Sequence, residues 1–166
     1  MTSIPRLLAV AVGGALIWLV AAAQLPSQTR LHVSSVVAGA VVSQPYGCTD
    51  LDLEPFDPFC PLHHFHTGLD LAAPSGTEVR SATSGVARTA FDPAGAGLFV
   101  TVIVNPHVRI LYCHLSAFRV ADGEAVAPGQ LIGLVGMTGL ATGAHVHFEI
   151  DVDAKSVDPD AWLASE

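Results

Sequence analysis

Positively charged residues are scarce in this chain of 166 residues. Lys and Arg together number 7 against 15 Asp and Glu, and the formal net charge at pH 7 is −8. With so few basic side chains, the chain has no stripe of positive charge to neutralise a phosphate backbone, so we expect no nucleic-acid partner. The acidic residues gather around residues 50–57 and near the C-terminal end, where a solvated surface is the simplest interpretation.

The single lysine excludes one further class of protein. Residues 126–133 (VAPGQLIG) are similar to a segment of lipoyl and biotinyl carrier domains, which require a modifiable lysine in a tight turn. Lys155 is the only lysine of the chain, and it lies close to the C-terminal end instead. A carrier function is therefore excluded.

Cysteine is also scarce, with 3 residues. Cys48 and Cys60 enclose a loop rich in proline and acidic residues (TDLDLEPFDPF), and closing such a loop covalently is favourable in an oxidising compartment. We therefore predict a Cys48–Cys60 disulfide in preference to two free thiols or a second metal site. Cys113 lies in an apolar strand pattern, so we expect a small buried thiol there rather than a reactive one.

Only one long apolar run is present, and it lies at the N-terminus. Residues 7–23 are apolar or glycine throughout and follow Arg6, and residues 21–23 are small enough for a cleavage site. The run is at the short end of what spans a bilayer, so an uncleaved anchor helix is the alternative to a cleaved signal peptide. Both alternatives predict a secreted or cell-envelope protein, with membrane contact only through this apolar helix if it is uncleaved. The predicted organisation is a signal peptide or anchor at 1–23, a linker at 24–37 and a domain at 38–166.

After this leader no sustained helical period occurs. Short apolar runs alternate with Gly, Pro, Asn and Asp turn residues, which indicates a compact all-β domain. We predict an antiparallel β-sandwich or barrel-sandwich-like architecture, monomeric, with at most one helical turn around residues 158–163. The predicted strands are Ala38–Ser43, Glu78–Ala82, Gly85–Phe91, Leu98–Val104, Val108–Cys113, Leu131–Val135 and His145–Val152.

The last predicted strand carries the clearest chemical signal. Alternate residues of a strand face the same side, so His145, His147 and Glu149 share one face while the apolar residues between them face a core. Surface histidines would show the same alternation, so this strand alone does not separate metal ligands from exposed residues. The Gly/Thr-rich loop at 136–143 favours a site, since it lets a substrate backbone approach closely.

His66 and Asp70 form a second candidate pair. They are four residues apart with Gly68 between them, and in a bent segment both side chains can reach one cation. Catalytic zinc usually has three protein ligands from His, Asp and Glu, and a fourth position open to water. His63 and His64 lie nearby, and on spacing alone either could be the ligand. We rank both as groove-wall or supporting residues.

His114 is a further candidate. It follows the apolar strand pattern at residues 108–113 and lies beside a turn, a position from which a side chain can enter a groove. Taken alone, this segment favours a structural histidine. His32 and His107 have no partner pattern, and we expect both at the surface.

Together these segments resemble the lysostaphin/LytM-type zinc endopeptidases, which cut the peptide part of bacterial peptidoglycan. The resemblance extends from about residue 42 to residue 163 and rests on several motifs in the same order. These motifs are H-T-G-L-D (66–70), A-P-S-G-T-E-V (73–79), Y-C-H-L-S (112–116), P-G-Q-L-I-G (128–133) and T-G-A-H-V-H-F-E (142–149). The fold that the resemblance implies is a small antiparallel β-structure with a metal groove, which agrees with the strand pattern.

The resemblance implies roles for five residues. His66, Asp70 and His147 would bind Zn2+. His114 and His145 would act on the water and on the developing oxyanion, with peptidoglycan as the substrate. All five positions are filled, unlike those of family members that have lost ligands and act as activators of other hydrolases.

Two features depart from the family pattern. Cys113 occupies a position where the family commonly has Gly or Ala, and the Cys48–Cys60 loop is an insertion ahead of the first ligand motif; neither removes a ligand. Two other functions stay open. One is a non-catalytic wall-binding or hydrolase-activating adaptor that keeps a structural metal, and the other is an unrelated secreted zinc peptidase that acts on protein.

Overall fold

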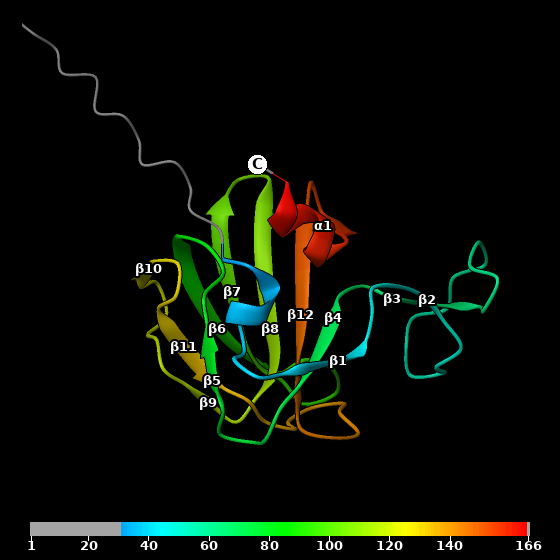
Figure 1. Cartoon of the computed structure of the whole chain (residues 1–166), viewed down its shortest axis with the longest axis horizontal. Coiled ribbons are helices and arrows are strands. Elements are labelled where there is room, and N and C mark those ends of the chain that lie inside the picture. Colours follow the sequence, from blue (N-terminus) through cyan, green and yellow to red (C-terminus); the bar gives the residue numbers. More distant parts are fainter. Residues whose placement is uncertain (1–30, 166) are drawn as a thin grey trace, which may run out of the picture.

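The computed structural model describes residues 31–165 and is built almost entirely of β-strands (Figure 1). The apolar helix expected at 1–23 and the first part of the expected linker, 24–30, lie outside these residues. The elements, in chain order, are η1 (Val33–Ser35), β1 (Val41–Gln44), β2 (Gly47–Thr49), β3 (His64–His66), β4 (Leu69–Ala72), β5 (Glu78–Arg80), β6 (Gly85–Asp92), β7 (Gly97–Asn105), β8 (Val108–Leu115), β9 (Ala117–Phe118), β10 (Ala125–Val126), β11 (Leu131–Leu134), β12 (His145–Val152), β13 (Lys155–Val157) and α1 (Pro159–Ala164).

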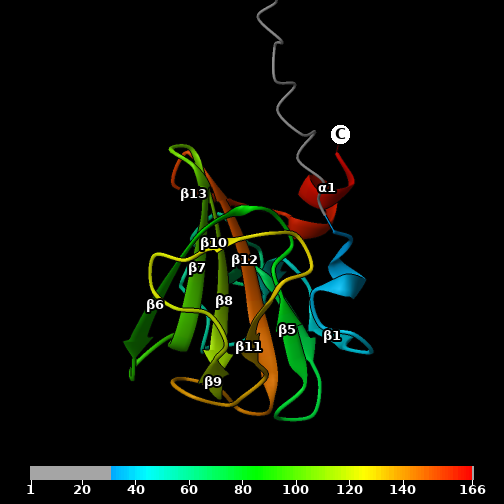
Figure 2. The ribbon, with the colours of Figure 1, turned by 90° about the vertical axis from the view of Figure 1, so that its left-hand side faces the viewer.

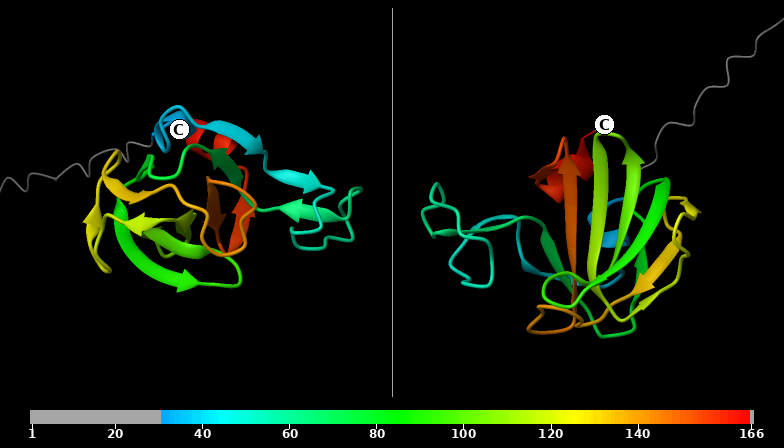
Figure 3. Two further views of the ribbon diagram at one scale, coloured as in Figure 1. Left: turned by 90° about the horizontal axis from the view of Figure 1, so that it is seen from below. Right: turned by 180° about the vertical axis from the view of Figure 1, so that it is seen from behind.

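One large antiparallel sheet organises the molecule, in the order β1-β4-β12-β8-β7-β6-β10, with β13 paired to β12. Strand β12 lies between β4 and β8, and places His147 opposite Asp70 on one side and Ile150 opposite Ile110 on the other. A smaller sheet, β5-β11-β9, packs beside the large one (Figure 2). The pair β2–β3 projects from the body of the molecule, as Figure 3 shows from below and from behind.

The hydrophobic core lies on one face of the large sheet. Val146, Phe148 and Ile150 alternate along β12 and have no exposed surface, and they pack with buried residues of both sheets, such as Val79 and Ile132. Each apolar side chain of this size contributes about 1.5–3 kcal/mol when fully buried. Because a strand has a period of two, the polar residues between these apolar ones face the opposite side of the sheet. That opposite side carries the site described below.

The all-β antiparallel prediction is confirmed, and all seven predicted strands are present with ends within three residues of those expected. The predicted helical turn is α1, where the Asp158 side chain accepts hydrogen bonds from the backbone N–H groups of Asp160 and Ala161. Six strands are not predicted by the sequence pattern: β2, β3, β4, β9, β10 and β13. These strands have two to four residues, which is too short for an alternating pattern to be recognised.

The second part of the expected linker, 31–37, belongs to the packed domain. Val33, Val36 and Val37 are at most 5% exposed and join the core, and the Arg80 backbone N–H donates to the Val36 carbonyl at 2.8 Å. The domain therefore begins before residue 38. The segment is short and has no helical or strand period, so its own sequence does not indicate that it is buried; its burial depends on partners far away in the sequence.

The predicted Cys48–Cys60 disulfide is present, with the two Cα atoms 5.5 Å apart. Cys113 is free and buried, as expected. Among residues 31–165, no helix has the length and apolar character needed to cross a membrane.

Candidate metal centre and groove

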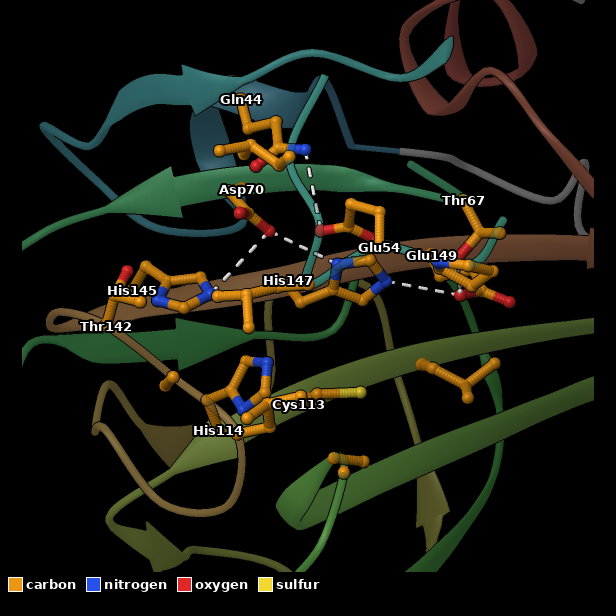
Figure 4. Close-up of a pocket in the computed structure, with 18 residues that line it drawn as sticks. Gln44, Glu54, Thr67, Asp70, Cys113, His114, Thr142, His145, His147 and Glu149 are labelled. Atoms are coloured by element: carbon orange, nitrogen blue, oxygen red, sulfur yellow. Dashed lines mark hydrogen bonds and ion pairs between the residues drawn. The ribbon is translucent and has the colours of Figure 1, made fainter. Parts of the chain in front are cut away.

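Three predicted ligands meet on the face of the large sheet that is opposite the core. His66 ends β3, Asp70 lies in β4, and His147 lies directly across from Asp70 in β12. His66 Nε2 is 2.9 Å from His147 Nδ1 and 3.2 Å from Asp70 Oδ1. His147 Nδ1 is also 3.2 Å from Asp70 Oδ1 (Figure 4). These side chains form a group that could hold a metal ion. The fold thus brings His66 and Asp70 together with His147, which lies far from them in the sequence, in one cluster.

A glycine allows the first ligand segment to pass so close to β12. A Cβ atom at Gly68 would lie 2.6 Å from the Phe148 carbonyl oxygen and 2.9 Å from the His147 ring. Any side chain there would push β3 and β4 away from β12 and separate His66 from His147. Gly68 is therefore required by the close approach of two backbones.

Hydrogen bonds fix how the two ligand imidazoles are turned. His66 Nδ1 donates to the Pro45 carbonyl at 2.9 Å, and a carbonyl can only accept, so Nε2 keeps the lone pair. His147 Nε2 donates to Glu149 Oε2 at 3.2 Å, and the same oxygen accepts from Thr67 Oγ1 at 2.6 Å. When His147 is neutral, as metal binding requires, the lone pairs of His66 Nε2 and His147 Nδ1 both point toward the shared position beside Asp70. Such outer partners orient metal-binding histidines in general.

The electrostatics of the cluster suit a cation. Burial raises the pKa of Asp70, but its contacts with the His147 and His66 imidazoles outweigh burial and hold that pKa well below its ordinary value. Burial lowers the pKa of His147, whereas hydrogen bonds to Asp70 and Glu149 raise it more strongly, to about 9. The carboxylates of Asp70 and Glu149 thus favour positive charge at His147, and they would stabilise a bound cation at the same place.

The other two predicted residues lie beside the cluster. The His114 and His145 rings are 4.7 Å apart between centroids, and His145 Nε2 is 3.7 Å from Asp70 Oδ1. His114 Nδ1 donates to the Thr138 carbonyl and His145 Nδ1 to the Gly143 carbonyl, each at 2.9 Å. Each ring therefore keeps Nε2 available to accept or release a proton.

Burial lowers the pKa of His114, and the nearby imidazoles of His145 and His147 lower it further, while its hydrogen bond to Thr138 acts in the opposite direction. Its backbone also has a positive φ of 61°, in the left-handed region that residues other than glycine rarely adopt. The end of β8 thus holds His114 in an unusual conformation that directs a mainly uncharged ring toward the groove.

A groove of about 390 Å³ contains the site. Its floor comes from β8 and β12, and its walls come from the loops at 95–96 and 140–142 and from the segment before β3. The lining residues are Gln44, Leu51, Leu53, Glu54, Pro55, Thr67, Asp70, Gly95, Ala96, Leu111, Cys113, His114, Leu140, Ala141, Thr142, His145, His147 and Glu149. The Gly/Thr-rich loop therefore lies beside the histidines, as the sequence suggested.

The remaining histidines do not join the cluster. His64 Nδ1 donates to the Glu54 carbonyl at 2.7 Å and its Nε2 is 3.4 Å from Asp52, while His63 stacks with the Phe56 ring. Both stabilise the segment that forms a groove wall rather than lining the groove. The sequence ranking of His66 above His63 and His64 agrees with this arrangement.

Sequence reasoning missed several residues of the site. The contact of Glu149 with His147 could have been predicted from the sequence, because Glu149 lies two positions after His147 on the same strand face. No sequence pattern indicates the contacts of Thr67 and Glu54, since these contacts depend on how loops fold back onto the sheet. The carbonyl groups of Pro45 and Thr138 gave no signal either, because every residue has a backbone carbonyl.

Comparison with known proteins agrees with this geometry. Residues 64–159, more than half of the chain, match the family described as Peptidase family M23. The chain belongs to peptidase family M23. The lysostaphin/LytM resemblance drawn from the motifs is thereby confirmed.

Two curated relatives show the extent of the similarity. The DD-carboxypeptidase/endopeptidase Mpg of Neisseria meningitidis is 38% identical over 118 residues, which are 71% of this chain and 26% of Mpg. The peptidoglycan DD-endopeptidase ShyA of Vibrio cholerae is 38% identical over 93 residues, which are 56% of this chain and 22% of ShyA. The chain thus spans about a quarter of the length of these relatives.

Solved structures share the fold. The catalytic domain of lysostaphin from Staphylococcus simulans superposes with a TM-score of 0.66 and 28% identity, over 81% of this chain and 100% of that domain. A zinc-containing peptidase from Vibrio cholerae superposes with a TM-score of 0.67 and 27% identity, over 80% of this chain and 40% of that protein. The described residues therefore share the M23 peptidase fold.

Proposed function

We propose that this chain is a zinc-dependent endopeptidase that hydrolyses peptide bonds in the stem or cross-bridge of bacterial peptidoglycan. The observation that carries the proposal is the convergence of His66, Asp70 and His147 beside an open groove that Asp70 and His147 line together with His114 and His145. Membership of family M23 and the similarity to the peptidoglycan DD-endopeptidase ShyA support it. A purely structural metal in an adaptor is not favoured, because two further histidines present free Nε2 atoms to the same groove.

The donor set suits zinc. Zinc accepts imidazole nitrogen and carboxylate oxygen at about 2.0–2.2 Å, and around a tetrahedral ion such donors lie roughly 3.3 Å apart. The donor separations of 2.9, 3.2 and 3.2 Å are close to that value. When bound, zinc would supply a Lewis acid that polarises a peptide carbonyl and lowers the pKa of water.

The side chains of the chain would move the protons. His114, whose pKa is lowered, is uncharged at neutral pH and can accept a proton at Nε2 from the attacking water. The His145 ring lies near both the His114 ring and the Asp70 carboxylate. When protonated at Nε2, His145 can stabilise a developing oxyanion. Either ring can then return a proton to the leaving amine. The wall loops hold the peptide along the groove.

We also propose that the domain works outside the cytoplasm, in the cell envelope or secreted. The apolar N-terminal sequence supports this location. The Cys48–Cys60 disulfide supports it too, because disulfides persist in oxidising compartments.

Turbidity of purified cell walls tests the proposed function. The full-length protein should clear a wall suspension, a chelator should stop the clearing, and added zinc should restore it. Release of free amino groups without reducing sugars would identify peptide-bond cleavage. Binding to walls without clearing would favour the adaptor, and cleavage of casein but not of walls would favour a general protein peptidase.

A further inference from the structure

The insertion before the first ligand forms a distinct arm, residues 47–66, which comprises β2, β3 and the loop between them (Figures 1 and 3). The Cys48–Cys60 disulfide closes the loop. Backbone hydrogen bonds hold it internally, from Phe65 N–H to the Pro55 carbonyl and from Asp57 N–H to the His63 carbonyl. The arm therefore has a defined shape.

The arm contributes one wall of the groove, through Leu51, Leu53, Glu54 and Pro55. Leu51 is 45% exposed and Leu53 is 53% exposed, so both leucines offer apolar surface that a ligand can cover. Burial of such surface by an aliphatic chain would favour binding. The wall is thus apolar apart from one carboxylate.

That carboxylate, Glu54, has no cationic partner among the described residues. Within residues 31–165, its one hydrogen bond is a long contact of 3.4 Å from Gln44 Nε2, visible in Figure 4, and no lysine or arginine of these residues lines the groove. The other two groove carboxylates are engaged, since Asp70 contacts the ligand histidines and Glu149 accepts from His147 and Thr67. Glu54 is therefore the groove carboxylate left to meet a ligand.

We propose that Glu54 is a specificity residue that binds an ammonium group at the end of an aliphatic side chain, such as that of a diamino-acid residue in the substrate peptide. This inference rests on the proposed peptidase function. The carboxylate supplies a charge-assisted hydrogen bond, and Leu51 and Leu53 cover the methylene groups behind the ammonium. A backbone α-amine has no such stem, so the apolar wall favours the side-chain amine.

Acetylation of wall amines tests the proposal. One batch of purified cell walls is divided, half is N-acetylated and half is mock-treated, and kcat/KM is measured for each from the newly released amino groups. The wild-type protein should lose about tenfold in kcat/KM on acetylated walls, mainly through KM, because a charge-assisted hydrogen bond is lost. Glu54→Gln should cleave both halves at similar rates.

The matched control is Asp50→Asn, which removes the same charge from an exposed position of the arm that does not line the groove. It should keep the wild-type preference for free amines. The proposal is overturned if acetylation slows the wild type and Glu54→Gln equally, or slows neither. If the wild-type protein cleaves neither the acetylated nor the mock-treated walls, the result would instead reject the proposed peptidase function on which this inference rests.

Short peptides separate the two sources of ammonium. A lysine-containing peptide acetylated only at its α-amine and one acetylated only at its side-chain amine are compared as competitive inhibitors of wall hydrolysis. The first should inhibit the wild type more strongly, and Glu54→Gln should remove the difference. Stronger inhibition by the peptide with a free α-amine would contradict the side-chain assignment.

Discussion

Each of the four site histidines has one ring nitrogen bound to a fixed acceptor and the other turned toward the site. His66 and His147 use Pro45 and Glu149 as acceptors and face one another, which creates a pocket for a cation. His114 instead donates to a loop carbonyl, and its free nitrogen faces the groove. Identical side chains thus take up different proposed roles because different nitrogens are engaged.

Alanine substitution at the five residues should separate metal binding from proton transfer. His66→Ala, Asp70→Ala and His147→Ala should lose both bound zinc and activity, because each removes a donor atom. His114→Ala and His145→Ala should retain zinc while kcat falls about 10²–10⁴-fold, the usual contribution of a general acid or base. Metal analysis of the purified variants alongside wall-clearing rates measures both effects. Equal zinc loss in all five variants would contradict this division.

The lowered pKa of His114 predicts the acidic side of the pH profile. Burial disfavours the charged ring, so His114 stays neutral below the ordinary histidine pKa of about 6.5. Since the neutral ring is the base, kcat/KM should stay level from about pH 7 to 6.5 and decline at lower pH. A profile of kcat/KM against pH on cell walls checks this. A decline centred above pH 6.5 would show that another group controls the reaction.

At the scale of secondary structure, β12 serves both the core and the site. Its buried residues Val146, Phe148 and Ile150 fix the strand in the sheet, and this fixes the direction of His145 and His147 on the other face. Antiparallel pairing with β4 then brings Asp70 beside His147. Precision at the site therefore derives from packing on the opposite face of the same strand.

The segment before β1 is an element of the core, and this is testable. Val36→Ala should lower the free energy of unfolding by about 1–3 kcal/mol, because the Val36 side chain is fully buried. Val41→Ala, at a position that is 70% exposed, is the control and should change it by less than about 1 kcal/mol. Denaturant unfolding followed by circular dichroism measures both. Equal small effects would mean that residues 31–37 contribute little to the core.

Across the whole molecule, the core and the candidate metal site occupy opposite faces of one sheet. When His147 is protonated, its Nδ1 can donate to His66 Nε2 or to Asp70 Oδ1, so the cluster has hydrogen-bond partners without an ion. We therefore expect the fold to form without zinc, in contrast to small domains that are unfolded without it. Besides the core and the metal site, the molecule has the arm at residues 47–66, which is attached at one side and contains the Cys48–Cys60 disulfide.

Metal removal should weaken the domain without unfolding it. At a free zinc concentration of 100 times Kd, binding would stabilise the folded state by about 2.7 kcal/mol, so chelation should lower Tm by roughly 5–10 °C. Thermal unfolding with and without a chelator measures the shift, and the far-UV circular dichroism at 25 °C should not change. His66→Ala is the control, in which the chelator should have no effect. Loss of the far-UV signal on chelation would show that the fold requires the metal.

The sequence by itself determined the periodic part of this protein. Period-two alternation predicted the long strands, the Cys48–Cys60 spacing predicted the disulfide, and ordered motifs led to the family. These features are local or nearly so, and they depend on which side chains fit a pleated, half-buried strand.

Only the tertiary structure decided the contacts between distant segments. It placed Val36 in the core, joined His66 to Glu149 through His147, and brought Glu54 of the arm to the groove. Such contacts depend on strand order and on how loops fold back, and a strand of two to four residues or a single carboxylate has no period from which to read them. Pairing between β4 and β12, far apart in the chain, is what turned separate motifs into one site.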